Sequence, residues 1–161
     1  MKKLLAALIL VLATSNVSSE STPKLPVNSI YSEEDIIWLA KNVYFEAANQ
    51  ATAGRLAVLM VTLNRVAHSK FPNSVKEVVT QGGTRLHRCQ FSWYCDGKAD
   101  KIRDWEAFNE IKQLVYAYIQ IASRMTDITS GAIYYHATYV KPYWASEKKK
   151  IIRIGDHIFY K

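Results

Sequence analysis

Glu46 is the carboxylate in this sequence whose surroundings most favour acid chemistry. At about 100° per residue, residues 33–48 form a helix that is apolar on nearly every side, and Glu46 lies at the margin of its main apolar stripe. Burial raises the pKa of a carboxyl group, and an acid still protonated near neutral pH can protonate the leaving oxygen of a glycoside. A second interpretation stays open, in which Glu46 is an ordinary carboxylate paired with Arg55 or Arg65.

A polar and aromatic loop around residues 84–98 supplies groups of the kind that bind sugars. Aromatic faces stack on the C–H bonds of pyranose rings, and amide and hydroxyl groups hydrogen-bond to the ring substituents. A strand near residue 135 and a tryptophan beyond it are candidates for a second wall. The candidate substrate-binding residues are Gln90, Phe91, Ser92, Trp93, Tyr135, His136, Trp144 and Asn64. Alternatively, the loop aromatics cover the core and the histidine is structural.

Cys89 and Cys95 lie six residues apart. In an exported chain this spacing favours a disulfide, which in turn disfavours a cysteine nucleophile. The four histidines and the two cysteines offer metal ligands, but no H-E-x-x-H or paired-histidine motif is present. The sequence therefore predicts neither a metal site nor another cofactor.

Helices of 33–48, 52–67 and 103–124 and a short helix ending at Val79 are predicted, and Trp105 is expected on the inner face of the long one. Ser32 and Asp35 approximate a capping box at the first helix. A strand near 134–136 and a hairpin of 151–154 with 157–160, turning at Gly155-Asp156, complete the chain. The predicted fold class is α+β, mainly α, with a small C-terminal β element.

The amino-terminal segment has the pattern of a secretory signal peptide. Lys2 and Lys3 precede an apolar run of about ten residues, too short to span a bilayer. We predict a signal peptide over residues 1–19, a flexible leader over 20–31 and one domain over 32–161. Removing the two lysines leaves 19 basic against 14 acidic side chains, a net charge of +5. An exported basic protein suits polyanionic surfaces such as cell-wall polymers, and no motif favours nucleic acid.

Seven blocks, in order, resemble the SleB/CwlJ-type cell-wall hydrolases. They begin at Trp38 and end at Tyr160, so the resemblance covers about residues 33–161. The blocks are Trp38-Leu39-Ala40 with Val43-Tyr44-x-Glu46-Ala47, Gly54 to Val58, Val61 to Val66, Phe71 to Val79, Gln90 to Trp93, Gly131 to His136, and Pro142-x-Trp144 with Ile154 to Tyr160.

This resemblance implies a lysozyme-like fold, related to lytic transglycosylases and resuscitation-promoting factors, with one essential glutamate at Glu46. The family commonly has a second acidic residue where this chain has Gln50, in the run Glu46-Ala47-Ala48-Asn49-Gln50. If that position carried the essential acid, the protein would be inactive or altered. Since the first glutamate is retained, we expect activity.

The expected activity is cleavage of peptidoglycan glycan strands by a monomeric protein in the periplasm or cell wall. Transglycosylation is favoured over hydrolysis because hydrolysis commonly needs a second carboxylate, for which Asp96, Asp100 and Asp104 are candidates. Two alternatives are a noncatalytic peptidoglycan-binding protein and a metal-dependent amidase. A phage endolysin and a periplasmic wall-remodelling enzyme are both consistent with the export signal. We expect the protein to interact with a membrane only through its signal peptide, during export.

Overall fold

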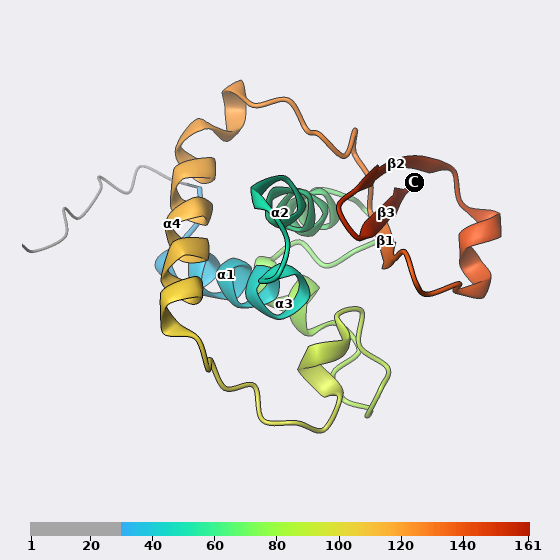
Figure 1. The fold of residues 1–161 in the computed structure, drawn as a ribbon, viewed down its shortest axis with the longest axis horizontal. Coiled ribbons are helices and arrows are strands. Elements are labelled where there is room, and N and C mark those ends of the chain that lie inside the picture. Colours follow the sequence, from blue (N-terminus) through green and yellow to red (C-terminus); the bar gives the residue numbers. More distant parts are fainter. Residues whose placement is uncertain (1–29) are drawn as a thin grey trace, which may run out of the picture.

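The computed structural model describes residues 30–161. The expected signal peptide and nearly all of the expected leader lie outside these residues. The described elements, in chain order, are α1 (Glu33–Ala47), α2 (Thr52–Val66), α3 (Val75–Thr80), η1 (Ser92–Cys95), α4 (Trp105–Ile121), η2 (Ala122–Arg124), β1 (Tyr134–Ala137), η3 (Tyr143–Glu147), β2 (Lys150–Ile154) and β3 (His157–Tyr160). The helices gather on one side and the sheet on the other (Figure 1). The predicted class, mainly α with a small C-terminal sheet, is confirmed.

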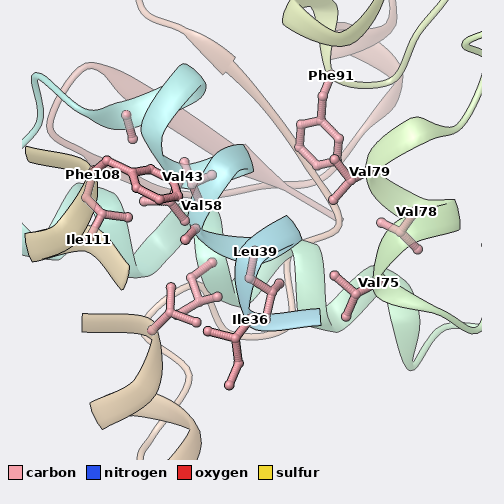
Figure 2. Close-up of a cluster of buried hydrophobic side chains, with 14 of the residues drawn as sticks. Ile36, Leu39, Val43, Val58, Val75, Val78, Val79, Phe91, Phe108 and Ile111 are labelled. Carbon is pink, nitrogen blue, oxygen red and sulfur yellow. The ribbon is translucent and has the colours of Figure 1, made fainter. Parts of the chain in front are cut away.

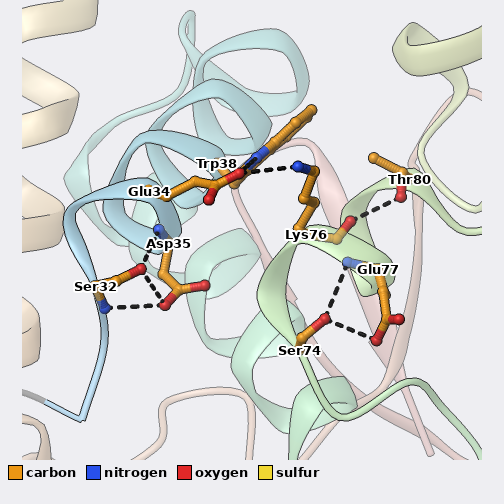
Figure 3. A network of polar contacts seen from close by, with 8 residues as sticks. All are labelled: Ser32, Glu34, Asp35, Trp38, Ser74, Lys76, Glu77 and Thr80. Atoms are coloured by element: carbon orange, nitrogen blue, oxygen red, sulfur yellow. Dashed lines mark hydrogen bonds and ion pairs between the residues drawn. The ribbon is translucent and has the colours of Figure 1, made fainter.

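The predicted capping box at the start of α1 is present (Figure 3). The Ser32 hydroxyl accepts a hydrogen bond from the Asp35 backbone N–H at 3.1 Å, and the Ser32 N–H donates to the Asp35 carboxylate at 2.9 Å. Glu34 then accepts a hydrogen bond from Lys76 of α3 at 2.9 Å. Because this ion pair is exposed, it contributes little to stability.

Helix α1 is enclosed by the other three helices (Figure 2). Its buried side chains include Ile36, Leu39 and Val43, each at most 1% exposed. Partners come from all three helices and from the loop before η1: Val58, Leu59, Val75, Val78, Val79, Phe91, Phe108, Ile111 and Val115. A helix packed on several sides has little freedom to tilt or rotate, so its last turn, which carries Glu46, is held in place.

Trp105 corrects one expectation for α4. We predicted it on the inner face, yet its side chain is 62% exposed. Trp105 is the first residue of the helix, and its ring lies edge-on to Phe108 at 5.7 Å with most of its surface in solvent. Helical periodicity predicts the direction in which a side chain points, but it does not predict how far along the helix the packed neighbouring elements extend.

The sheet is antiparallel with the strand order β1-β3-β2. Phe159 of β3 packs with Ala132 against Ala57 and Val61 of α2, and all four are fully buried. This second cluster attaches the sheet to the helices. Among the described residues, no helix combines the length and apolarity needed to cross a membrane.

Candidate functional site

A cleft of about 470 Å³ opens between the helices, the disulfide-closed loop and the sheet. Helices α1 and α2 supply Phe45, Glu46 and Arg65. The loop and sheet supply Gln90, Ser92, Trp93, Asp96, Tyr135, His136, Ala137 and His157, and the segment after β1 supplies Tyr139 and Val140 at the rim. A cavity of this size lies within the range of ligand-binding pockets.

Glu46 lies in the last turn of α1 and contacts the cleft with a partly exposed side chain. Burial raises the pKa of its carboxyl group, and a hydrogen bond from Tyr135 and the positive charge of Arg65 oppose that rise without cancelling it. The protonated form is thereby favoured relative to a free glutamate. The site therefore holds a carboxylic acid suited to donating a proton.

Tyr135 of β1 positions this acid. Its hydroxyl donates to Glu46 Oε2 at 2.9 Å. Burial and the neighbouring Glu46 carboxyl hold the pKa of Tyr135 well above its usual value, so the tyrosine stays a donor. Because the bond ties one carboxyl oxygen, and no hydrogen bond between described residues reaches the other, Oε1 remains for a ligand in the cleft.

Neither arginine forms an ion pair with Glu46. Arg55 pairs with Glu110 at 3.6 Å and donates to the carbonyl of Ala48 at 2.6 Å. Arg65 is only 4% exposed, and its Nε–H donates to the carbonyl of Ile133 at 2.8 Å. The interpretation of Glu46 as one half of an ordinary salt bridge is therefore wrong.

The loop wall is closed by a disulfide between Cys89 and Cys95, whose Cα atoms are 6.0 Å apart. Gln90 and Ser92 are exposed and line the cleft. Trp93 also lines it, but its ring stacks on Phe45 at 4.5 Å. Since only 8% of Trp93 is exposed, it offers little surface to a ligand.

Phe91, predicted to bind substrate, lies outside the cleft. It is 1% exposed and packs in the core, with the Arg65 guanidinium 4.8 Å from its ring centre. In this loop of alternating polar and aromatic residues, the alternative that a loop aromatic covers the core holds for Phe91. Its contribution to the site is to enclose Arg65.

The sheet wall carries His136, which lines the cleft and whose ring stacks on Tyr160 at 5.3 Å. Its Nε2 lies 2.9 Å from the Tyr160 hydroxyl. Trp144, also predicted to bind substrate, packs edge-on against His136 and Tyr160 outside the cleft. Trp144 thus packs against the residues of the sheet wall without lining the cleft itself.

Asn64 also lies away from the cleft. Its amide donates to the Asp127 carboxylate at 2.8 Å and to the carbonyl of Ala132 at 3.1 Å. These bonds fix the segment that leads into β1. A polar residue near a helix end has the same appearance in sequence whether it binds a ligand or anchors a loop, and Asn64 anchors a loop.

Gln50, the departure from the family pattern, lies outside the cleft as well. Its Oε1 accepts from the Asp156 backbone N–H and its Nε2 donates to the Asp156 carboxylate, both at 3.1 Å. The neighbouring Gly155 has a φ of +55°, and a Cβ there would collide with Gln50 Oε1. The amide therefore joins the α1–α2 corner to the β2–β3 turn.

Several cleft residues were not among the sequence candidates: Phe45, Arg65, Ala137, Tyr139, Val140 and His157. Asp96, named from the sequence as a candidate second carboxylate, does line the cleft, whereas Asp100 and Asp104 do not. Burial lowers the pKa of His157, so its ring is neutral near pH 7. Phe45 adjoins Glu46 in the sequence, but nothing in its spacing distinguishes it from a surface position. Within residues 30–161, no group of three or more His, Cys, Asp or Glu side chains is gathered as a metal site requires.

Comparison with known proteins gives consistent matches. Residues 49–160 match the family described as Cell Wall Hydrolase. Spore cortex-lytic enzymes are similar, at 29% identity over 132 residues in Bacillus cereus (81% of this chain, 46% of the relative) and 30% over 131 residues in Bacillus subtilis (80% and 38%). The chain thus spans less than half the length of these two relatives.

Two solved structures are similar over 81% of the chain. The catalytic domain of the germination-specific lytic transglycosylase SleB from Bacillus anthracis has a TM-score of 0.64 and 31% identity, covering 81% of this chain and 97% of that one. The catalytic domain of the Bacillus cereus SleB protein has the same TM-score and identity, covering 81% and 92%.

Proposed function

The chain belongs to the cell wall hydrolase family, and on this basis we propose that it cleaves the glycan strands of peptidoglycan with Glu46 as general acid. One observation carries the proposal: a carboxyl group with a raised pKa faces a cleft, held through one oxygen by Tyr135. The likeness to a catalytic domain named as a lytic transglycosylase supports it. We place the activity at the cell wall, outside the cytoplasm.

The reaction needs only one carboxyl group if the nucleophile is a hydroxyl group of the glycan strand and not a water molecule. Glu46 gives its proton to the glycosidic oxygen between N-acetylmuramic acid and N-acetylglucosamine as the bond from that oxygen to C1 breaks. The 6-hydroxyl of the muramic acid then bonds to C1 and returns its proton to the Glu46 carboxylate. The product is a 1,6-anhydro ring, and the acid is regenerated without water.

Mass spectrometry of fragments released from purified peptidoglycan tests this proposal. Anhydro-muropeptides from the wild-type protein are the expected products. Reducing ends in their place would keep the glycosidic cleavage but make it hydrolytic. Binding to sacculi without any released fragment would instead favour the noncatalytic wall-binding alternative.

Asp96 is the carboxylate that tests the one-acid mechanism. It lines the cleft, and a hydrogen bond from the Lys98 backbone N–H, at 2.9 Å, lowers its pKa and keeps it ionised. We expect Asp96→Asn to retain anhydro products with kcat within about threefold, since transglycosylation requires no second carboxylate. Asp100→Asn, at a nearby exposed position outside the cleft, is the control. Loss of turnover in Asp96→Asn alone would assign this carboxylate to catalysis.

Tyr139 is positioned to stack on a sugar at the rim of the cleft. Its side chain is 86% exposed and lines the cleft, whereas Tyr143 is equally exposed and does not. Tyr139→Ala should raise KM by about three- to tenfold with kcat unchanged, because an aromatic stacking contact contributes on the order of 1 kcal/mol. Tyr143→Ala is the matched control. Equal effects of the two substitutions would remove Tyr139 from substrate binding.

A further inference from the structure

Arg65 is a buried cation without an anionic partner. Its side chain is 4% exposed, and it forms no ion pair with a carboxylate in the described part of the chain. Its Nε–H donates to a backbone carbonyl, and its Nη1 is enclosed with no hydrogen-bond partner among residues 30–161. The rings of Phe71 and Phe91 lie 5.3 and 4.8 Å from the guanidinium carbon. Aromatic faces offset only part of the cost of burying a charge.

The charge of Arg65 acts on the cleft. Arg65 is the only lysine or arginine among the cleft-lining residues. Burial lowers the pKa of Arg65, and the charges of Tyr135 and Glu46 partly oppose this fall. Arg65 in turn lowers the pKa of Glu46. The two groups thus interact electrostatically although no ion pair or hydrogen bond joins them, as a low-dielectric interior allows.

The other titratable groups at the cleft do not duplicate this charge. They are Tyr135 and His136 of β1, His157 of β3, Tyr139 at the rim and Asp96 after η1. Burial keeps His157 neutral near pH 7, and Asp96 is an anion. The charge of Asp96 is balanced by its ion pair with Lys98, at 3.3 Å. Among the described cleft residues, the negative charge that Glu46 gains on ionising is therefore the one left to balance Arg65.

Building on the proposed function, we propose that Arg65 is a positioning residue whose buried cation stabilises the carboxylate left when Glu46 gives its proton to the glycosidic oxygen. The interaction is stronger after proton transfer than before it, and only such differential interactions raise kcat. The charge is fixed in advance by the packing of the two phenylalanines, so little reorganisation is needed during the reaction. Burial favours the protonated form of Glu46, and Arg65 makes the release of that proton easier.

Arg65→Met and Arg65→Lys separate the charge from the packing. Methionine is of similar length and flexible enough to fill the space without the charge, and lysine keeps the charge. Arg65→Gln takes the place of Arg65→Met if the latter does not fold, because its amide can still donate to the Ile133 carbonyl. Arg55→Met is the matched control: it removes a cation from the same helix that does not line the cleft.

Two readouts are needed. One is the pH dependence of kcat for release of soluble fragments. The other is the titration of the Glu46 carboxyl carbon by NMR, assigned through its absence in Glu46→Gln. We expect Arg65→Met to lower kcat roughly ten- to thirtyfold, as one unit charge acting through low-dielectric protein would. Both the alkaline limb of the profile and the titration should move to higher pH.

Arg65→Lys should stay near the wild type in both titrations, and so should Arg55→Met. A purely structural arginine would lower activity and thermal stability but leave both midpoints in place, and that outcome would overturn the proposal. The NMR titration does not depend on turnover. A wild-type protein that releases no fragments would therefore refute the proposed function while the effect of Arg65 on Glu46 could still be measured.

Discussion

Glu46→Gln is expected to lower peptidoglycan cleavage by about two to four orders of magnitude, the usual contribution of general acid catalysis. Glutamine has nearly the same shape, and its amide oxygen can still accept the hydrogen bond that Tyr135 donates to Oε2. It has no acidic proton to give. The measurement is the rate of release of soluble fragments by both proteins over a range of pH.

The same substitution should make the protein more stable at neutral pH. Because burial raises the Glu46 pKa above its usual value, the folded state holds this proton more tightly than the unfolded state. The stabilisation is complete below the unfolded pKa and is lost as pH rises through the folded pKa. Glutamine has no such loss, so Tm of Glu46→Gln should exceed that of the wild type at pH 8, with the two converging near pH 4.

Glu106→Gln, at an exposed position on α4, is the control for both measurements and should change neither. Retained cleavage in Glu46→Gln would remove Glu46 from the mechanism. A lower Tm at pH 8 would mean that the carboxylate is stabilised in the folded state, contrary to the burial described above.

Gln50→Glu is expected to destabilise the protein by about 2 kcal/mol at pH 7, the typical cost of losing one donor and leaving its partner unsatisfied. The new carboxylate would face the Asp156 carboxylate, which now accepts from Gln50 Nε2 at 3.1 Å. The expected fall in Tm is roughly 5–10 °C. It should be smaller near pH 4, where one carboxyl of the pair can stay protonated and donate.

A double-mutant cycle isolates this contact. Combining Gln50→Glu with Asp156→Asn supplies an amide donor from the other side and should recover most of the lost Tm. Gln113→Glu, the same change at an exposed position on α4, is the control. If Gln50→Glu left Tm at pH 7 unchanged but raised kcat, the glutamine at this position would affect catalysis and would not be needed to hold the two turns together.

The sequence predicted the elements better than the contacts between them. The capping box of Ser32 with Asp35 and the turn at Gly155-Asp156 are local patterns, and both helix start and hairpin are confirmed. The hydrogen bond from Tyr135 to Glu46 joins residues 89 apart in the chain. The local sequence pattern around either residue says nothing about the other, so this contact could not be predicted from the residues alone.

Buried polar side chains were the hardest to assign. Asn64 and Arg65 are neighbours on α2, yet Asn64 anchors a loop and Arg65 lines the cleft. The sequence offered Asn64 as a substrate contact and Arg65 as a salt-bridge partner, and the structure supports neither. The direction of a helix face is predictable, but which other element lies against each turn depends on the tertiary fold.

The strand order determines at which stage of synthesis the cleft can form. In the described sheet, β1, which carries Tyr135, pairs with β3 alone, and β3 comes later in the chain than both β1 and β2. A chain made from its amino end can bury the apolar face of α1 while β3 is still missing, but Tyr135 has no sheet to hold it against Glu46. A chain synthesised only as far as β1 therefore holds Glu46 without a fixed Tyr135, and this hydrogen bond can form only after β3 has paired with β1.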